Sequence, residues 1–364
     1  MDTSELEGIL TSYLFWNKAR IKCFVKMLLA LINVRTTNMA ELACAFRSKA
    51  KGLSRYQRMQ RFIKEIKIDH KFIAMFVVKL FGLERKRLYL TMDRTNWKFG
   101  KVKINILVLG IVYKGIALPL YWKLLNKAGN SDTKERIEIV TRFVEQFGKD
   151  NIAGILADRE FIGDEWFGFL IKEKLPFYIR IKNNIITTNA RGLEVDIDGL
   201  FYGVGIHEIS VLRGKRKVFD RELYLAGTKD KNGELLIIAT NCDAQDAVEI
   251  YAKRWEIETL FGCLKTKGFN FEDTHLRNLN RIGTLMVLLT IGFCWCYKIG
   301  EWRHEVRPIK LKKHGRRAIS LFRYGLDFIR ELLLGFKQMC KSFKVCIQIL
   351  YPAGTTYLLL SKAN

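Results

Sequence analysis

The sequence predicts a mixed α/β protein in which one helical region precedes the sheet-forming segment and another follows it. Three observations support this prediction. Apolar residues recur at helical spacing through residues 1–84. From residue 85 the pattern changes to strand-like alternation, interrupted by two helical stretches. After residue 265 the helical pattern returns, and the 364 residues are enough for two or three domains.

The composition indicates a globular protein with a polyanionic partner. Hydrophobic residues make up 49% of the chain, and the formal net charge is +25. Such an excess costs self-repulsion, so nucleic acid is the first candidate partner and an anionic membrane surface the second. The N-terminus lacks a basic, apolar secretory signal, and the longest apolar run, residues 284–297, is short for a bilayer span of about 20 residues. We therefore expect a cytoplasmic protein that does not enter a membrane.

The first 84 residues predict a helical domain. A long apolar-periodic stretch covers residues 14–34. Asn38, with Glu41 three residues later, predicts the start of a helix over residues 39–46. Ser54, followed by Gln57, predicts the start of a second helix over residues 55–64.

This second helix is rich in arginine and glutamine, with Arg55, Arg58 and Arg61 spaced three residues apart. A short helix, a turn and a basic helix are typical of a DNA-reading helix-turn-helix-like unit. A solvated basic helix face fits this segment alone equally well. The net charge of the whole chain favours DNA.

Residues 85–181 predict the core of the sheet. Strands are predicted at residues 87–93, 102–113, 116–124, 152–158 and 177–181, and helices at 131–148 and 164–174. Three strands in a meander, then helix, strand, helix and strand, is the order of a ribonuclease H-like fold. In that fold the ends of the first and fourth strands are neighbours, so Asp93 and Asp158 would meet. Singly, an aspartate after a strand is more often a turn or cap residue.

The rest of the chain divides into three ranges. Residues 182–243 contain short strand patterns separated by glycine-containing turns and predict a β-rich insertion into the core. Residues 244–300 return to the core, and residues 301–364 form a basic, helical C-terminal region. Helices are predicted at residues 298–317 and 321–336. The basic segment either binds DNA through counterion release or is a solvated linker.

Residues 251–265 predict one helix with an unusual polar stripe. Tyr251, Arg254, Glu258 and Lys265 fall within an arc of about 60° on a regular helix. An amphipathic helix with an ordinary ion pair between Arg254 and Glu258 is the simpler interpretation. The spacing Tyr-x2-Arg-x3-Glu-x6-Lys, however, resembles the Y-R-E-K signature of a large family of bacterial insertion-sequence transposases.

Two further motifs extend this resemblance over roughly residues 85–300. They are Asp93-Arg-Thr-Asn-Trp97 and Asp158-Arg-Glu-Phe161. The resemblance implies that Asp93, Asp158 and Glu258 are the catalytic Asp-Asp-Glu (DDE) triad. The triad would bind two Mg2+ ions, for which Mn2+ can substitute. Tyr251, Arg254 and Lys265 would position DNA phosphates.

The function implied is cut-and-paste transposition. The protein would bind the terminal inverted repeats of its own element, cut the DNA ends and join them to target DNA, acting as a homodimer on DNA. Two alternatives stay open: a DNA-binding protein of transposase ancestry that no longer cuts, and a ribonuclease H-like nuclease without strand transfer. The scattered histidines and the absence of a Cys-x2-Cys pair give no support to a zinc site.

Overall fold

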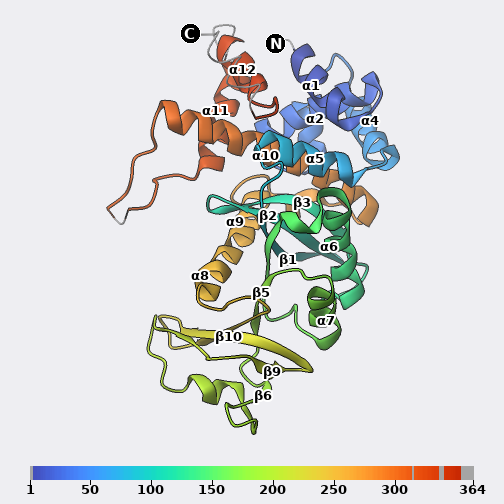
Figure 1. Cartoon of the computed structure of the whole chain (residues 1–364). Helices are drawn as coiled ribbons and strands as arrows, with labels where there is room; N and C mark the ends of the chain where they lie inside the picture. Colours follow the sequence, from blue (N-terminus) through green and yellow to red (C-terminus); the bar gives the residue numbers. More distant parts are fainter. Residues whose placement is uncertain (1–2, 314, 336–339, 354–364) are drawn as a thin grey trace. The chain divides into compact units, whose positions relative to one another are not determined.

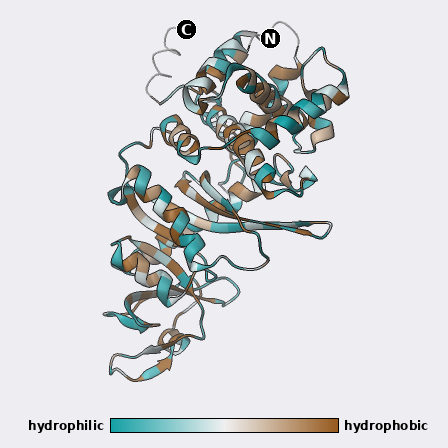
Figure 2. Cartoon of the chain, turned by 90° about the vertical axis from the view of Figure 1, so that its right-hand side faces the viewer, coloured by the Kyte–Doolittle hydropathy of each residue, from teal (hydrophilic) through white to brown (hydrophobic). Residues whose placement is uncertain are grey.

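The structure, a computed structural model, describes residues 3–313, 315–335 and 340–353 (Figure 1). Its contacts group the chain into two compact units. The first comprises Met1–Glu84, Trp97–Ile104 and Phe261–Asn364, and the second comprises Arg85–Asn96 and Asn105–Leu260. Residues 1–84 therefore pack in one unit with the C-terminal helices, and the five predicted domain ranges stay a prediction. In Figure 2 hydrophobic and hydrophilic residues alternate along the helices and strands, as amphipathic elements require.

Five helices form the N-terminal part of the first unit, and the prediction of helical structure there is confirmed. They are α1 (Ser4–Leu14), α2 (Lys18–Val34), α3 (Met39–Ala45), α4 (Gly52–Glu65) and α5 (His70–Leu80). The predicted continuous stretch 14–34 is wrong, because Phe15 adopts a left-handed φ of 49° and ends α1. The Asn17 side chain then caps α2 by accepting a hydrogen bond from the Arg20 N–H at 2.9 Å.

The predicted caps of the next two helices have different outcomes. Asn38 caps α3 as predicted and accepts a hydrogen bond from the Ala40 N–H at 3.0 Å. The prediction for Ser54 is wrong, because α4 begins at Gly52 and its N-cap residue is Lys51. The loop between α3 and α4 is therefore shorter than the sequence pattern suggests.

The C-terminal part of the first unit is built around α10 (Leu279–Val306), with α11 (Leu321–Leu334) and α12 (Cys340–Gln348). By length and composition α10 could cross a membrane, but 94% of its most apolar window is buried inside the protein, as in a core helix. The predicted helix 298–317 is wrong, since α10 ends at Val306. Arg307 precedes Pro308, and a residue before proline disfavours the helical conformation. Residue 336, the predicted end of the last helix, lies outside the described residues.

Helices α10 and α11 approach closely because glycines lie where they cross. A Cβ atom added to Gly325 would lie 1.8 Å from the Cys296 carbonyl oxygen. A Cβ atom added to Gly300 would lie 1.9 Å from the carbonyl oxygen of Leu321. Both distances are far below van der Waals contact, so only glycine permits this backbone-to-backbone packing.

The second unit contains a mixed sheet with the strand order β3-β2-β1-β4-β5-β11-β10-β8. The predicted succession of three strands, helix, strand, helix and strand is confirmed. The elements are β1 (Leu88–Phe99), β2 (Val102–Tyr113), β3 (Ile116–Leu124), α6 (Thr133–Phe147), β4 (Ile152–Ala157), α7 (Asp164–Lys172) and β5 (Phe177–Ile181). Strand β4 is parallel to both β1 and β5.

The pairing of β1 with β4 contains a shift of one residue near its start. Leu88 pairs with Ile152, but Tyr89 pairs with Gly154, so Ala153 is the extra residue. From there the register is regular to Met92 and Ala157. Gly154 suits this position, because an added Cβ would lie 2.9 Å from the Tyr178 ring and 3.1 Å from the Tyr89 ring.

Residues 182–243, the predicted β-rich insertion, contain short strands, and two of these strands extend the main sheet. Strands β10 (Arg221–Lys229) and β11 (Leu235–Thr240) continue the main sheet, with β11 antiparallel to β5. Their main-chain groups pair with those of β5, which would otherwise leave an exposed sheet edge. A separate two-stranded sheet is formed by β6 (Ile186–Thr188) and β7 (Glu194–Asp196), while β8 (Ile209–Val211) and β9 (Arg216–Val218) pair with β10.

Candidate active site

The parallel strands β1 and β4 bring two of the predicted acids together. Met92 and Ala157 are paired, so Asp93 and Asp158, the next residues, lie on neighbouring strands with backbones about 5 Å apart. Each carboxylate accepts a hydrogen bond from the following arginine's N–H, at 2.7 Å from Arg94 and 2.6 Å from Arg159. These local hydrogen bonds orient one oxygen of each carboxylate.

The predicted single helix over residues 251–265 is wrong. The segment forms α8 (Ala247–Ala252), a 3-10 turn (Lys253–Trp255) and α9 (Glu256–Leu264). A 3-10 turn has three residues per turn instead of 3.6, so the side chains of α9 project in different directions from those that one continuous helix would give. The Glu256 side chain fixes the start of α9 by accepting hydrogen bonds from the N–H groups of Tyr113 at 2.7 Å and Gly115 at 3.0 Å.

Arg254, in the 3-10 turn, joins the first acid to the third. Its side chain is only 4% exposed. One terminal nitrogen lies 3.4 Å from Asp93 Oδ2, and the other donates to Glu258 Oε1 at 2.8 Å. A buried guanidinium needs such counter-charges, because burial of an unpaired cation is costly. Asp93 and Glu258 thus share one cation, although 165 residues separate them in the chain.

The Tyr251 ring packs near the Arg254 guanidinium. The ring is 3% exposed and packs in a cluster with Leu156, Tyr178 and Ile238. The Arg254 guanidinium lies 5.8 Å from the centre of the ring. Burial raises the pKa of Tyr251 to about 12, so the phenol is protonated at neutral pH. Its predicted contact with a DNA phosphate stays a prediction.

Lys265 follows the end of α9 and belongs to the first unit. Its ammonium group pairs with Glu272 at 2.7 Å and lies 5.8 Å from the centre of the Trp97 ring. Trp97 in turn packs edge-on against Phe271. The predicted role of Lys265 beside the acids stays a prediction.

A second ion pair, which the sequence reasoning missed, connects the two aspartate motifs. Arg94, next to Asp93, binds both carboxylate oxygens of Glu160 at 2.6 and 2.7 Å. Arg94 also donates to the carbonyl oxygen of Gly129 at 2.6 Å. The buried Arg136 donates to the backbone carbonyl of Glu160 at 2.9 Å. The arginine after each aspartate was visible in the sequence, but a partner 66 residues away was not.

The side chain of Asp93 is 19% exposed. Burial raises the pKa of Asp93 to about 6, and the charges of Glu160 and Asp158 act in the same direction. The Arg94 N–H and the Arg254 guanidinium oppose this rise. Carboxylates are the oxygen donors that Mg2+ and Mn2+ prefer.

The donor chemistry therefore fits a hard divalent cation, and Asp93, Asp158 and Glu258 are the side chains that would hold it. In the arrangement seen here, Arg254 supplies the positive charge that Asp93 and Glu258 share. Among the described residues, no three His, Cys, Asp or Glu side chains lie close enough to hold a metal ion together. Arg254 thus holds Asp93 and Glu258 together in this structure, whereas Asp158 is placed by the pairing of β4 with β1.

The raised pKa of Asp93 predicts a specific pH dependence of stability. A carboxyl group with a folded-state pKa near 6 and an unfolded value near 3.8 destabilises the fold when ionised. This cost is absent below about pH 4 and complete above about pH 6. Asp93→Asn should therefore raise the free energy of unfolding by about 2–3 kcal/mol at pH 7.5 and change it little at pH 4.

Urea denaturation at the two pH values measures this difference. Asp246→Asn, which removes one carboxylate from an exposed position at the start of α8, is the matched control. Equal effects of Asp93→Asn at pH 4 and pH 7.5 would contradict the prediction.

The predicted DNA-reading arginines on α4 occupy different environments. Arg55 donates to the Phe46 carbonyl at 3.2 Å and so caps the end of α3. Arg58 lies 5.9 Å from the centre of the Phe46 ring. Arg61 is exposed. Arg61 is therefore the arginine of the three with the most freedom to contact a partner.

Comparison with known proteins agrees with the geometry. The sequence model of a family described as the transposase DDE domain matches residues 77–295. No curated protein matches the sequence. A solved structure of a piggyBac transposase synaptic complex with hairpin DNA is similar at 13% identity, over 93% of this chain and 77% of that chain, with a TM-score of 0.45. At that score the likeness says nothing about function.

Proposed function

Because the chain belongs to the DDE transposase family, we propose that it is a cut-and-paste transposase that cuts DNA at the ends of its element and joins them to a target. The observation that carries the proposal is the convergence of three separate segments on one site. Asp93 and Asp158 are neighbours on parallel strands, and Arg254 ties Glu258 to Asp93. We assign these three acids as the catalytic triad.

The chemistry needs an activated oxygen nucleophile and neutralised charge around the phosphorus. Two divalent cations, Mg2+ or Mn2+, would supply both when bound to Asp93, Asp158 and Glu258. The protein's own part is orientation. The N–H groups of Arg94 and Arg159 fix the two aspartates, and the Arg94–Glu160 pair ties strand β1 to the segment that follows β4.

Tyr251, Arg254 and Lys265 are assigned to phosphate positioning, as the Y-R-E-K pattern implies. Arg254 is the best supported of the three. Its guanidinium already lies between two carboxylates, and its buried Nε has no hydrogen-bond partner among the described residues. A guanidinium in this place can donate to a phosphate oxygen at the reacting centre.

We further propose that the N-terminal helices bind the inverted repeats and that the protein acts as a homodimer on DNA, since two ends must be paired. Target DNA would be bound by the same dimer. A bacterial cytoplasmic, nucleoid-associated location follows from the proposed insertion-sequence subgroup. The net charge of +25 supports DNA as the partner.

Recognition of the element ends should depend on Arg61. Arg61→Ala is expected to weaken binding of a specific end by about 1–3 kcal/mol if the side chain contacts a base, and to flatten the salt dependence if it contacts phosphate. Fluorescence anisotropy over a salt series measures both. Arg191→Ala, at an exposed arginine of the second unit, is the control. An unchanged affinity and salt slope for Arg61→Ala would remove α4 from the recognition surface.

The proposed function is tested with the wild-type protein and a duplex carrying the element end. The inverted repeats are found by sequencing the DNA that flanks the gene. Binding followed by Mg2+- or Mn2+-dependent nicking, and joining of pre-cut ends to a second duplex, would support a transposase. Nicking without joining would indicate a nuclease. Binding without nicking under either metal would indicate a DNA-binding protein of transposase ancestry.

A further inference from the structure

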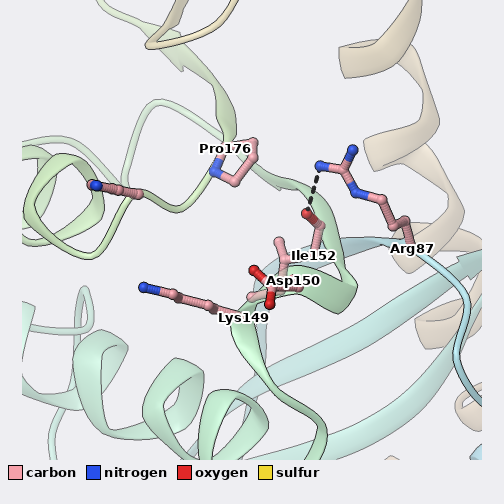
Figure 3. A pocket seen from close by; sticks show the side chains of 6 residues that line it. Arg87, Lys149, Asp150, Ile152 and Pro176 are labelled. Atoms are coloured by element: carbon pink, nitrogen blue, oxygen red, sulfur yellow. Dashed lines mark hydrogen bonds between the residues drawn. The ribbon is translucent and has the colours of Figure 1, made fainter.

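A hollow in the second unit lies where strands β1, β4 and β5 begin, at the end of β4 away from Asp158. It has a volume of about 390 Å³ and is lined by Arg87, Lys149, Asp150, Ile152, Lys174 and Pro176 (Figure 3). This volume is within the range of small-ligand sites, about 300–1,000 Å³. The lining residues come from the segments that precede the parallel strands β1, β4 and β5. Asp158 follows the other end of β4, six residues or about 20 Å away.

The charge of the hollow is strongly biased. Three lining residues are cationic and one, Asp150, is anionic. In the part of the chain that the structure describes, Arg87, Lys149 and Lys174 form no ion pair. Three cations and one carboxylate give the lining a net charge of 3 − 1 = +2, which an anion placed in the hollow would balance.

The walls of the hollow are fixed by backbone hydrogen bonds. Arg87 donates to the Ile152 carbonyl at 3.3 Å, which holds its guanidinium against the start of β4 (Figure 3). The Pro176 carbonyl accepts a hydrogen bond from the Ile155 N–H at 2.8 Å. The backbone of the hollow and the Arg87 guanidinium are therefore held in place before a ligand binds, which lowers the entropy cost of binding.

Lys174 adds an independent observation. It adopts a left-handed φ of 57° just after the end of α7. Glycine takes this conformation without strain, whereas another residue pays about 1–2 kcal/mol. Its N–H donates to the Ile171 carbonyl at 3.0 Å, so the strained turn is held in place. A lysine at a position that favours glycine, beside two other cations, points to a use for its charge.

We infer that this hollow binds a backbone phosphate of DNA, as a second contact distinct from the site of the acids. The inference rests on the proposed function for the presence of DNA. Two features favour a phosphodiester of DNA over a free nucleotide or inorganic phosphate. The lining has no aromatic side chain on which a base could stack. The net charge of +25 on the whole chain favours a polyanion as the partner.

The experiment compares Lys149→Gln/Lys174→Gln with wild type for binding of a random-sequence duplex across a salt series. A lost phosphate contact should lower the slope of log K against log salt by about 0.9 and weaken binding several-fold at low salt. Lys134→Gln/Lys231→Gln removes the same charge from exposed positions outside the hollow and is the control. Lys174→Gly removes the charge while relieving the strained φ, so it should lose affinity yet fold at least as stably.

Lysine acylation read by mass spectrometry supplies a second measurement on the wild-type protein. A saturating duplex should protect Lys149 and Lys174. Protection by inorganic phosphate but not by duplex would assign the hollow to a free anion and overturn the inference. The inference would also be overturned if the duplex left both lysines unprotected and the double glutamine variant had the same salt slope as wild type. Failure of the proposed function has a different signature. In that case the duplex binds and protects the lysines, but wild-type protein never nicks it.

Discussion

Replacing any one of the three acids with its amide should lower nicking of an element-end duplex by about a thousandfold or more. The variants are Asp93→Asn, Asp158→Asn and Glu258→Gln. Each removes one charged oxygen donor from a site where the reaction has no other means of neutralising phosphate charge. Binding of the end should be nearly unchanged, because the proposed recognition surface on α4 belongs to the first unit. Nicking assays with Mg2+ and with Mn2+, paired with binding assays, measure both effects.

Two controls make this result interpretable. Glu249→Gln removes a carboxylate from an exposed position on α8 and should nick like wild type. Asp93→Asn is expected to be more stable than wild type at neutral pH, so its lost activity cannot be attributed to unfolding. Amide variants that nick as well as wild type would show that these acids are ordinary turn and helix residues.

The second large effect concerns stability. Gly325→Ala should lower the free energy of unfolding by about 3 kcal/mol or more, since the new methyl group would lie 1.8 Å from the Cys296 carbonyl oxygen and 2.7 Å from the Gly300 nitrogen. Backbone atoms on both helices would have to separate, and no side-chain rotation can relieve the clash. Chemical denaturation of the purified variant measures the loss.

Gly8→Ala is the matched control, because Gly8 also lies within a helix but has no atom within 4 Å of an added Cβ. Alanine there should stabilise the protein by up to about 1 kcal/mol through its higher helix propensity. If the two alanine variants were equally stable, the close crossing of α10 and α11 would be wrong.

The sequence predicted best those elements whose pattern is local. The bounds of β2, β3 and β5 agree with the predictions, since their apolar runs end at turn residues. The start of α6 also lies within two residues of the predicted one. Asp132 and Glu135 form a reciprocal capping box, which needs only residues three apart. The pairing of the ends of β1 and β4 followed from the element order.

What the sequence did not reveal depends on partners distant in the chain. Strand β1 was predicted to end at Asp93 but continues to Phe99. Its polar continuation carries Arg94, whose charge is balanced by Glu160. The 3-10 turn before α9 was missed for the same reason, because the anchor of Glu256 on Tyr113 and Gly115 is 141 to 143 residues away. Local periodicity cannot encode such contacts.

The extra residue Ala153 makes the pairing of the acids depend on strand register as well as on the two motifs. The stretch from Leu88 to Asp93 in β1 is one residue shorter than the stretch from Ile152 to Asp158 that lies beside it. If Tyr89 paired with Ala153 instead of Gly154, Asp93 would stand beside Ala157, and the Asp158 side chain would lie one step further along, on the opposite face of the sheet. Deletion of Ala153 would make the two stretches equal and leave the acids paired, whereas deletion of a residue between Leu88 and Asp93 would leave every motif residue intact and still separate them. An unaltered triad is therefore no guarantee of an active element, and the relative length of the two stretches belongs to the catalytic signature.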